Sequence, residues 1–358
     1  MPLKIEFMDI DYTQAYILDL SVHFVGNKTN HIDIKVSDAP ILLDSDMSIR
    51  MKDFFLKNIT KQSEKYQFTH IESLEFNEVF NFVGESLENT TPFHEVSKKV
   101  ARHLHDMTEH PNIKSGELYF VHFSNILVDR TPIDAIGIFK TENKSGFFQV
   151  NHSTTKFDID YFEGIDAGKI DKGCLVLDVE FETGFEIFLV DSASSKGDEA
   201  LYWKEDFLNV QVINDAYTQT KSFLNLAKDF VQHQVRKDIG TVERADQIDM
   251  LNKSISYFKG NDDFNQNTFE KEVFSEQSDV IGSFRDYAAV NQHSYGLDLD
   301  KGFEISIPAV KKQAKDFKSI LKLDKNFHIY IHGDRDLIER GTDENGKKFY
   351  KIFYKEES

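Results

Sequence analysis

The chain has 358 residues, and its 42 Lys and Arg against 61 Asp and Glu give a formal net charge of −19. Hydrophobic residues make up 40% of it, including 32 Phe, a composition that excludes disorder over most of the chain. Because the summed negative charge repels phosphate, it excludes nucleic-acid binding over the whole surface, but it allows a local basic patch.

The cysteine content and the N-terminus predict a cellular compartment. A single cysteine, Cys174, can form neither an internal disulfide nor a cysteine-based zinc site, which favours a reducing cytosol. The segment MPLKIEFMDIDY carries acidic residues where a signal peptide has an apolar core. No stretch approaches the roughly 18 uninterrupted apolar residues of a transmembrane helix. We therefore expect a cytoplasmic protein with no membrane partner.

The first half of the chain mixes strand and helix patterns. Apolar and polar residues alternate near the N-terminus, helical spacing begins at Asp46, and two more helices are predicted at about 75–88 and 92–109. Residues 117–190 then have the pattern of a β-meander, which includes CLVLDVEFE (174–182) as one strand. This half predicts an α+β domain over residues 1–190.

The second half is mostly helical. The small polar segment SASSKGDE (192–199) is the candidate linker to a second domain at 200–358. Helical patterns follow at about 213–237, 242–259, 268–276 and 278–291, and then at 309–325. The Asn345-Gly346 pair predicts the turn of a terminal β-hairpin. Since strands and helices are segregated rather than alternating, the fold class is α+β.

The segment AVKKQAKDFKSILKLDK (309–325) concentrates positive charge. On a helical wheel, Lys311, Lys315, Lys318 and Lys322 form a stripe beside the apolar stripe that begins at Val310. Such a helix could follow a phosphate backbone, and it could equally be a solvated face whose lysine stems cover apolar surface. The candidate nucleic-acid-binding residues are Lys311, Lys312, Lys315, Lys318, Lys322 and Lys325.

Charge is distributed unevenly along the sequence. Residues 309–358 hold twelve Lys and Arg against nine Asp and Glu, whereas residues 1–308 hold 30 against 52. The local excess of positive charge supports contact with DNA backbone, while the absence of Arg from 309–325 argues against reading of guanine bases.

Three other patterns suggest catalysis only weakly. GTDENGKK (341–348) begins like a phosphate-binding loop, but Lys348 replaces the required Ser or Thr and a strand pattern follows. The histidines of ARHLHDMTEH (101–110) face different directions on a helix, unlike a metal site. On a strand, Asp178, Glu180 and Glu182 would share one face and could hold Mg²⁺, although such residues are more typical of a solvated edge. We therefore predict no catalytic residues, no metal and no cofactor.

Two further features admit a nucleic-acid role. Trp203 in YWKEDF could stack on a base, but beside Tyr202 and Phe207 it is more typical of a packing anchor. Lys140 and Lys144 lie at a predicted hairpin end that could touch phosphate, and a charged turn is the simpler interpretation.

Six blocks follow one another along almost the whole chain: HFVGNKTN (23–30), MKDFFLKNI (51–59), ELYFVHFSNILVDRTPIDAIGIFKTENK (117–144), KIDKGCLVLDVE (169–180), ALYWKEDFLNV (200–210) and FKSILKLDKNFHIYIHGDRDLIERG (317–341). In this order and spacing they resemble the bacterial nucleoid-associated protein family. The resemblance implies a cytoplasmic protein that partitions with the nucleoid and binds DNA, and it supplies no catalytic or metal-binding residues.

Three functions remain open from the sequence. The first is sequence-nonspecific binding of double-stranded DNA without catalysis, in which a homodimer would double the lysine patch. The second is an acidic adaptor that reaches the nucleoid through a DNA-processing protein partner. The third is a metal-dependent phosphodiesterase that uses Asp178, Glu180 and Glu182.

Overall fold

The computed structural model describes residues 10–192, 201–275, 277–317, 320–324, 326–331 and 337–356. The chain divides into two compact units, unit 1 (Met1–Ile213) and unit 2 (Asn214–Ser358). The domain limits predicted from the sequence, 1–190 and 200–358, stay a prediction, because the candidate linker at 192–199 lies outside the described residues apart from Ser192.

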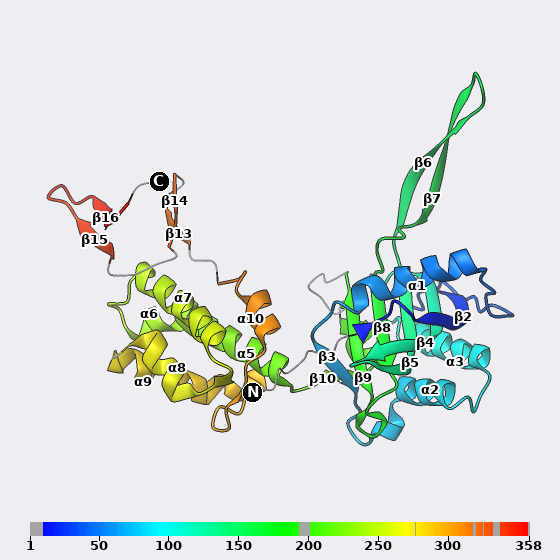
Figure 1. Ribbon diagram of the computed structural model, residues 1–358, viewed down its shortest axis with the longest axis horizontal. Coiled ribbons are helices and arrows are strands. Elements are labelled where there is room, and N and C mark those ends of the chain that lie inside the picture. The colour runs from blue at the N-terminus through cyan, green and yellow to red at the C-terminus, as the bar shows by residue number, and fades with distance from the viewer. Residues whose placement is uncertain are drawn as a thin grey trace. The chain divides into compact units, whose positions relative to one another are not determined.

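Unit 1 is built on an eight-stranded antiparallel sheet (Figure 1). Its strand order is β1-β4-β5-β8-β9-β3-β10, and β2 also pairs with β4. The strands are β1 (Ile10–Asp11), β2 (Tyr16–Val25), β3 (Lys65–Phe68), β4 (Gly116–Val128), β5 (Thr131–Thr141), β8 (Lys172–Leu177), β9 (Glu186–Asp191) and β10 (Val210–Val212). The predicted meander is confirmed by the pairing of β4 with β5, β5 with β8 and β8 with β9.

Helices cover both faces of this sheet. In β4, Leu118 and Phe120 belong to one core cluster and Val121 and Phe123 to the other, because successive side chains of a strand point to opposite faces. Helix α1 (Ser45–Ile59) packs on one cluster, and α2 (Glu78–Leu87) and α3 (Phe93–Asp106) pack on the other. Two buried faces explain why the central strands are nearly continuous apolar runs.

The strand predicted at 174–182 is shorter than expected. Strand β8 ends at Leu177, Glu180 has a left-handed φ of 57°, and Phe181–Thr183 form a 3-10 turn. The chain must reverse here to return as β9, and the reversal stacks Phe181 on Phe80 with ring centroids 5.2 Å apart. The prediction that Asp178, Glu180 and Glu182 share one strand face is therefore wrong.

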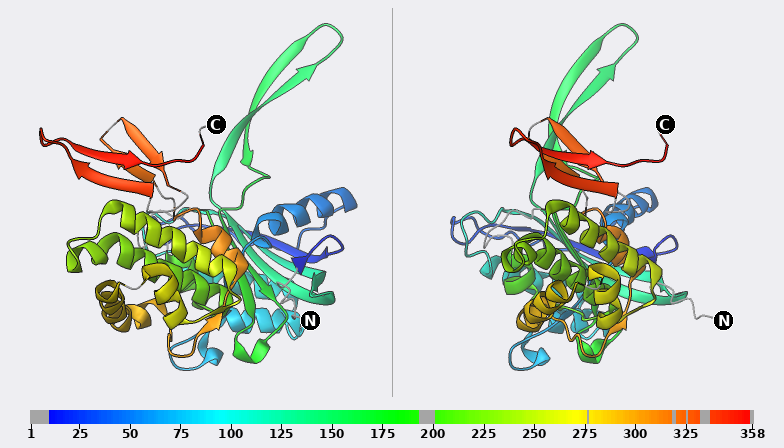
Figure 2. Two further views of the ribbon diagram at one scale, coloured as in Figure 1. Left: turned by 60° about the vertical axis from the view of Figure 1, so that its left-hand side comes forward. Right: turned by 90° about the vertical axis from the view of Figure 1, so that its left-hand side faces the viewer.

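A long hairpin leaves the sheet of unit 1 between β5 and β8. Strands β6 (Lys144–His152) and β7 (Phe157–Ile165) pair only with each other, in a separate two-stranded sheet. Figures 1 and 2 show this hairpin extending well beyond the sheet from which it emerges. We call residues 144–165 the arm. The meander pattern over 117–190 did not indicate that these two strands separate from the main sheet.

Unit 2 is a helical body with small β-hairpins. The helices are α5 (Ala216–Asp229), α6 (Val235–Asp238), α7 (Arg244–Gly260), α8 (Gln266–Phe274), α9 (Ser278–Asn291) and α10 (Ile307–Gln313), and a π-helix (Phe230–Gln234) joins α5 to α6. The paired strands are β11 (Asp263–Phe264) with β12 (Phe303–Glu304), β13 (Ile320–Leu323) with β14 (Phe327–Tyr330), and β15 (Ile338–Thr342) with β16 (Lys348–Ile352). The α+β class, the helical middle and the terminal hairpin are confirmed.

The core of unit 2 contains a cluster of aromatic rings. The rings of Phe223 and Phe264 lie 4.1 Å apart between centroids, and Phe230 and Phe284 lie 5.2 Å apart. Phe317 is buried in the same cluster. This cluster contains nine of the 32 Phe residues of the chain, counting Phe303, which packs against it. None of the helices in the described ranges combines the length and the hydropathy that a bilayer crossing requires.

The amphipathic helix predicted over 309–325 is wrong in length. Helix α10 ends at Gln313, the chain turns through 314–317, and residues 320–323 form β13. Ile320, Leu321 and Leu323 satisfy a strand period as well as a helical one, and the neighbouring segment FHIY supplies the pairing partner, with Leu321 opposite Ile329. Leu321 then packs with Ile248 and Ile338. Hairpin pairing and burial therefore outweigh helical spacing.

Candidate nucleic-acid interface

The candidate lysines do not form one helical stripe. Lys311 and Lys312 lie in the last turn of α10, and Lys315 lies in the turn that follows. Lys322 lies in β13, where its backbone is opposite His328. Lys318 and Lys325 lie outside the described residues. The predicted row of four ammonium groups on one helix is thus replaced by a helix end followed by a hairpin.

The lysines at the end of α10 are available to solvent. Lys311, Lys312 and Lys315 are exposed, and among the described residues no carboxylate lies within ion-pair distance of them. The Lys312 ammonium lies 6.0 Å from the centroid of the Tyr217 ring. Val310 is fully buried in the aromatic core, so the helix is held firmly while its lysines face outward. Cations at a helix C-terminus also complement the helix dipole.

A second group of lysines lies on the terminal hairpin. Lys347 and Lys348 are exposed at the turn between β15 and β16, and Lys351 lies 3.5 Å from Glu339 across the hairpin. Ile338 packs this hairpin against Ile248 of α7. The hairpin therefore carries its turn lysines on a structure that is docked to unit 2.

The charge totals of the two units differ greatly. Unit 1 holds 20 Lys and Arg against 36 Asp and Glu, a balance of −16, whereas unit 2 holds 22 against 25, a balance of −3. Within unit 2, the residues from 309 onward have a balance of +3. The part of the chain most compatible with phosphate is the end of unit 2.

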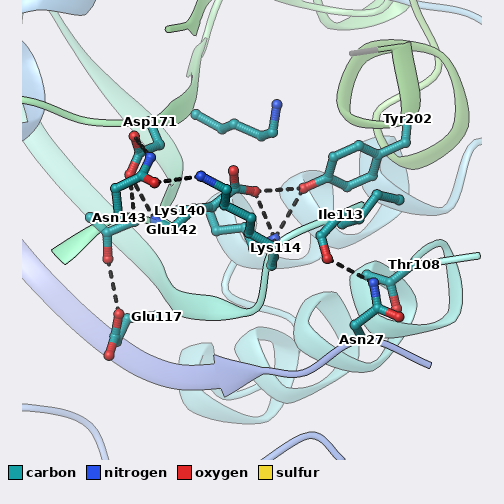
Figure 3. Close-up of polar contacts among 12 residues, drawn as sticks. Asn27, Thr108, Ile113, Lys114, Glu117, Lys140, Glu142, Asn143, Asp171 and Tyr202 are labelled. Carbon is teal, nitrogen blue, oxygen red and sulfur yellow. Dashed lines mark hydrogen bonds and ion pairs between the residues drawn. The ribbon is translucent and has the colours of Figure 1, made fainter. Parts of the chain in front are cut away.

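Lys140, which the sequence placed at an exposed hairpin end, is instead fully buried in unit 1. Its Nζ donates to the Lys114 carbonyl oxygen at 2.6 Å, to Glu142 Oε1 at 2.9 Å and to the Tyr202 hydroxyl at 3.0 Å. The Tyr202 hydroxyl also donates to Glu142 Oε1 at 3.0 Å (Figure 3). All three ammonium hydrogens of Lys140 are engaged within the protein, so this lysine cannot contact phosphate.

Burial governs the ionisation of this cluster. Removal from water lowers the pKa of Lys140, and the carboxylate of Glu142 opposes that shift. Burial, reinforced by Glu142, raises the pKa of Tyr202 well above its ordinary value. Lys172, also buried, pairs with Asp191 at 2.9 Å and lies 5.1 Å from the Tyr202 ring centroid. The sequence patterns did not predict this cluster. Its donors and acceptors bond to one another, as in a buried network that stabilises the fold.

Asp171 extends the cluster to the base of the arm. Its Oδ2 accepts hydrogen bonds from the backbone N–H groups of Glu142 at 2.7 Å and Asn143 at 3.0 Å, and its Oδ1 accepts from Asn143 Nδ2 at 2.7 Å (Figure 3). Burial alone would raise the pKa of Asp171, but these hydrogen bonds lower it overall. Lys114 Nζ donates to Asn143 Oδ1 at 2.6 Å, and Lys144 pairs with Glu117 at 3.3 Å. The chain is therefore fixed where β5 becomes β6.

The remaining candidate residues have structural surroundings. Trp203 is 1% exposed and packs against Phe207, as expected for an anchor. Cys174 is buried, which raises the pKa of its thiol. His103 contacts Glu78 at 2.6 Å and the Phe207 carbonyl oxygen at 3.2 Å. Within the described ranges, no three His, Cys, Asp or Glu side chains gather as metal ligands would.

Comparison with known proteins agrees with the resemblance seen in the sequence. No curated protein gives a significant match. The family model described as nucleoid-associated protein YejK matches residues 21–356, which span both units and nearly the whole chain. A match of this extent includes the strands of unit 1 from the second half of β2 onward, the helices of unit 2 and both terminal hairpins. The chain therefore belongs to the nucleoid-associated protein YejK family.

Proposed function

We propose that this protein binds double-stranded DNA without sequence specificity and without catalysis, through lysines at the end of unit 2. Membership of a nucleoid-associated family supports a role at the chromosome. The location of the proposed DNA-binding surface is supported by the exposure of Lys311, Lys312 and Lys315. These lysines lie in residues 309–358, where Lys and Arg outnumber Asp and Glu. Lys347 and Lys348 add two exposed cations on the docked hairpin.

The physical basis of this binding is counterion release. Each lysine that neutralises a phosphate displaces condensed cations from DNA, so log affinity falls with log salt by roughly 0.9 per neutralised phosphate. Lysine ammonium groups contact the backbone as point charges and do not discriminate between bases as a bidentate arginine does. The binding should therefore be weak above physiological salt and insensitive to sequence.

Charge reversal at α10 tests the proposed location. The triple variant Lys311→Glu, Lys312→Glu, Lys315→Glu should weaken duplex binding at least about tenfold in a low-salt mobility-shift assay. It should also reduce the salt slope by roughly 0.9 for each phosphate that is no longer neutralised. The control is Lys57→Glu, Lys61→Glu, Lys271→Glu, which changes three other exposed lysines and shifts the net charge equally. Equal binding by the two triple variants would remove α10 from the interface.

The absence of catalysis is tested separately. Supercoiled plasmid incubated with the protein and Mg²⁺ or Mn²⁺ should stay intact. Cleavage that disappears in the variant Asp178→Asn, Glu182→Gln would instead support the metal-dependent phosphodiesterase, although these residues do not share a strand face.

The charge of unit 1 favours a second candidate function. A balance of −16 suits contact with the basic face of a DNA-processing protein, which would bring the chain to the nucleoid as an adaptor. In that case the purified protein would not shift naked duplex, and nuclease treatment would leave its partner bound in a pull-down. Loss of the partner after nuclease treatment would favour direct DNA binding.

A further inference from the structure

The arm has one apolar face and one largely polar face. Pairing of β6 with β7 places Phe148 opposite Tyr161 and Val150 opposite Ile159 on one side, with His152 and Phe157 following toward the tip. On the other side, Phe147 and Phe162 near the base give way to polar pairs toward the tip: Gln149 with Asp160, and Asn151 with Asp158. We call the first side, formed by Phe148, Val150, Phe157, Ile159 and Tyr161, the apolar face of the arm.

The apolar face is exposed along its length. Its five side chains are between 56% and 73% exposed. From Phe148 and Tyr161 to the tip, apolar and polar positions alternate as in a strand with one buried face, yet the arm pairs with no other strand of the described residues. A two-stranded hairpin is only marginally stable in water by itself, so an uncovered apolar face of this length calls for a partner.

The base of the arm is rigid, which presents this face in a fixed position. Asp171 holds the backbone of Glu142 and Asn143 through two hydrogen bonds, and Ile165 packs on the core of unit 1 at the opposite strand. Anchoring on both strands lowers the conformational entropy that would be lost when the arm meets a partner. The arm is therefore built as an interaction element rather than as a loose loop.

We infer that the apolar face of the arm packs against the same face of a second copy of this chain, forming a homodimer. From Phe148 and Tyr161 to the tip, this face carries no Lys, Arg, Asp or Glu, and its charged members, Lys144 and Glu163, lie at the base. A two-fold axis brings identical patches together, which suits an uncharged apolar face because it meets itself without repulsion.

The size of the face fits a dimer interface. An aromatic side chain can bury roughly 150–250 Å². Three aromatic and two aliphatic side chains, all more than half exposed, therefore offer on the order of 500 Å² per copy, or about 1,000 Å² for the pair. This is about the area at which a specific protein interface begins.

DNA is a poorer occupant of the same face. The arm holds two lysines, Lys144 and Lys156, against Asp158, Asp160 and Glu163, so its own charge repels phosphate. Proteins that insert apolar side chains into the minor groove read it with Lys, Arg, Asn or Gln, whereas the two lysines of this arm are outnumbered by its three carboxylates. The inference does not depend on the DNA-binding proposal, because dimerisation is measured without DNA.

A matched pair of variants tests this interface. Val150→Glu and Gln149→Glu place one new charge at adjacent positions on opposite faces of β6. Sedimentation equilibrium of the full chain should show a dimer for the wild type and for Gln149→Glu. Val150→Glu should weaken the dimer at least about tenfold, since two carboxylates would be buried against apolar surface. A monomeric wild type, or a dimer that Val150→Glu leaves unchanged, would overturn the inference.

Energy transfer between arms locates the contact even if Val150→Glu disturbs folding. Because Cys174 is the only cysteine and is buried, Gln149→Cys provides a single accessible site for labels on the polar face. Mixing donor-labelled and acceptor-labelled copies should give strong energy transfer, which excess unlabelled wild type abolishes. A dimer without energy transfer would place the interface elsewhere and overturn the inference. Capture of a different protein by the arm would appear as a monomeric wild type.

Discussion

The two units use lysine in opposite ways. In unit 1, Lys140 and Lys172 are buried and each is paired with a carboxylate. In unit 2, Lys311, Lys312 and Lys315 are exposed at a helix end. A count of charges treats all of these residues alike, but only the second group can meet a phosphate. The charges that the fold leaves unengaged, rather than the number that the sequence contains, therefore determine where such an interface can form.

The cores of the two units also differ in how many ionisable groups they bury. Unit 1 encloses the Lys140, Glu142 and Tyr202 cluster and buries His23, so part of its stability depends on ionisation. The core of unit 2 consists mainly of Phe and aliphatic side chains, which do not titrate. Unit 1 should therefore respond strongly to acid and to substitutions in this buried cluster, whereas the Phe cluster of unit 2 contributes no ionisable group. Trp203, the single Trp, lies in unit 1, so its fluorescence reports on that unit.

We expect the substitution Lys140→Met to cause the largest change in the free energy of unfolding. Removing the ammonium leaves Glu142, whose side chain is 4% exposed, without its cation, and breaking a buried pair in this way costs about 3–5 kcal/mol. The free energy of unfolding of unit 1, measured by Trp203 fluorescence in urea, should fall by that amount.

Lys311→Met is the matched control for this change. Because Lys311 is exposed, the same substitution there should alter the free energy of unfolding of unit 2, followed by far-UV circular dichroism in urea, by no more than about 0.5 kcal/mol. Similar losses for the two variants would contradict the claim that the units use lysine differently.

How far the sequence could predict these features depends on the range of the contacts. The helix at Ser45–Ile59 and the turn at Asn345-Gly346 follow from local spacing and turn chemistry, and both were predicted. The segment 320–323 fits helical and strand periods alike, and only the pairing of Ile320 with Tyr330 decides between them. Lys140 and Tyr202 lie 62 residues apart, and no local pattern indicates their contact. The sequence therefore located the lysine-rich segment of the candidate interface, but it did not predict the helix end and hairpin that this segment forms.

Acid should destabilise unit 1 through His23. Its Nδ1 accepts a hydrogen bond from the Ser37 backbone N–H at 3.0 Å, and its Nε2 lies 2.8 Å from Ser97 Oγ, so the neutral ring is the one that fits. Burial, followed by repulsion from His94, Lys98 and Arg102, lowers the pKa of His23 from 6.5 to about 4.

The sign of the pH effect follows from that depressed pKa. Below pH 6.5 His23 is protonated in the unfolded chain but stays neutral in the native structure. The free energy of unfolding of unit 1 therefore falls as pH drops from 6.5 toward 4, by about 3 kcal/mol in all. Urea unfolding followed by Trp203 fluorescence at several pH values should show this slope. The slope should be shallower in His23→Gln, which has no ring to titrate, and an unchanged slope would assign the acid sensitivity to other groups.

The smallest expected effect is at an ion pair of unit 2. Arg340 Nη1 lies 3.2 Å from Glu243 Oε1, and the two side chains are 37% and 29% exposed, so water and salt screen their attraction. Arg340→Gln should lower the free energy of unfolding of unit 2 by no more than about 1 kcal/mol, a loss that vanishes in high salt. Far-UV circular dichroism of the urea transition at low and high salt measures both values. A loss as large as that of Lys140→Met would mean that this ion pair is shielded from water. The cations at the end of unit 2 would then stabilise the fold as Lys140 does in unit 1.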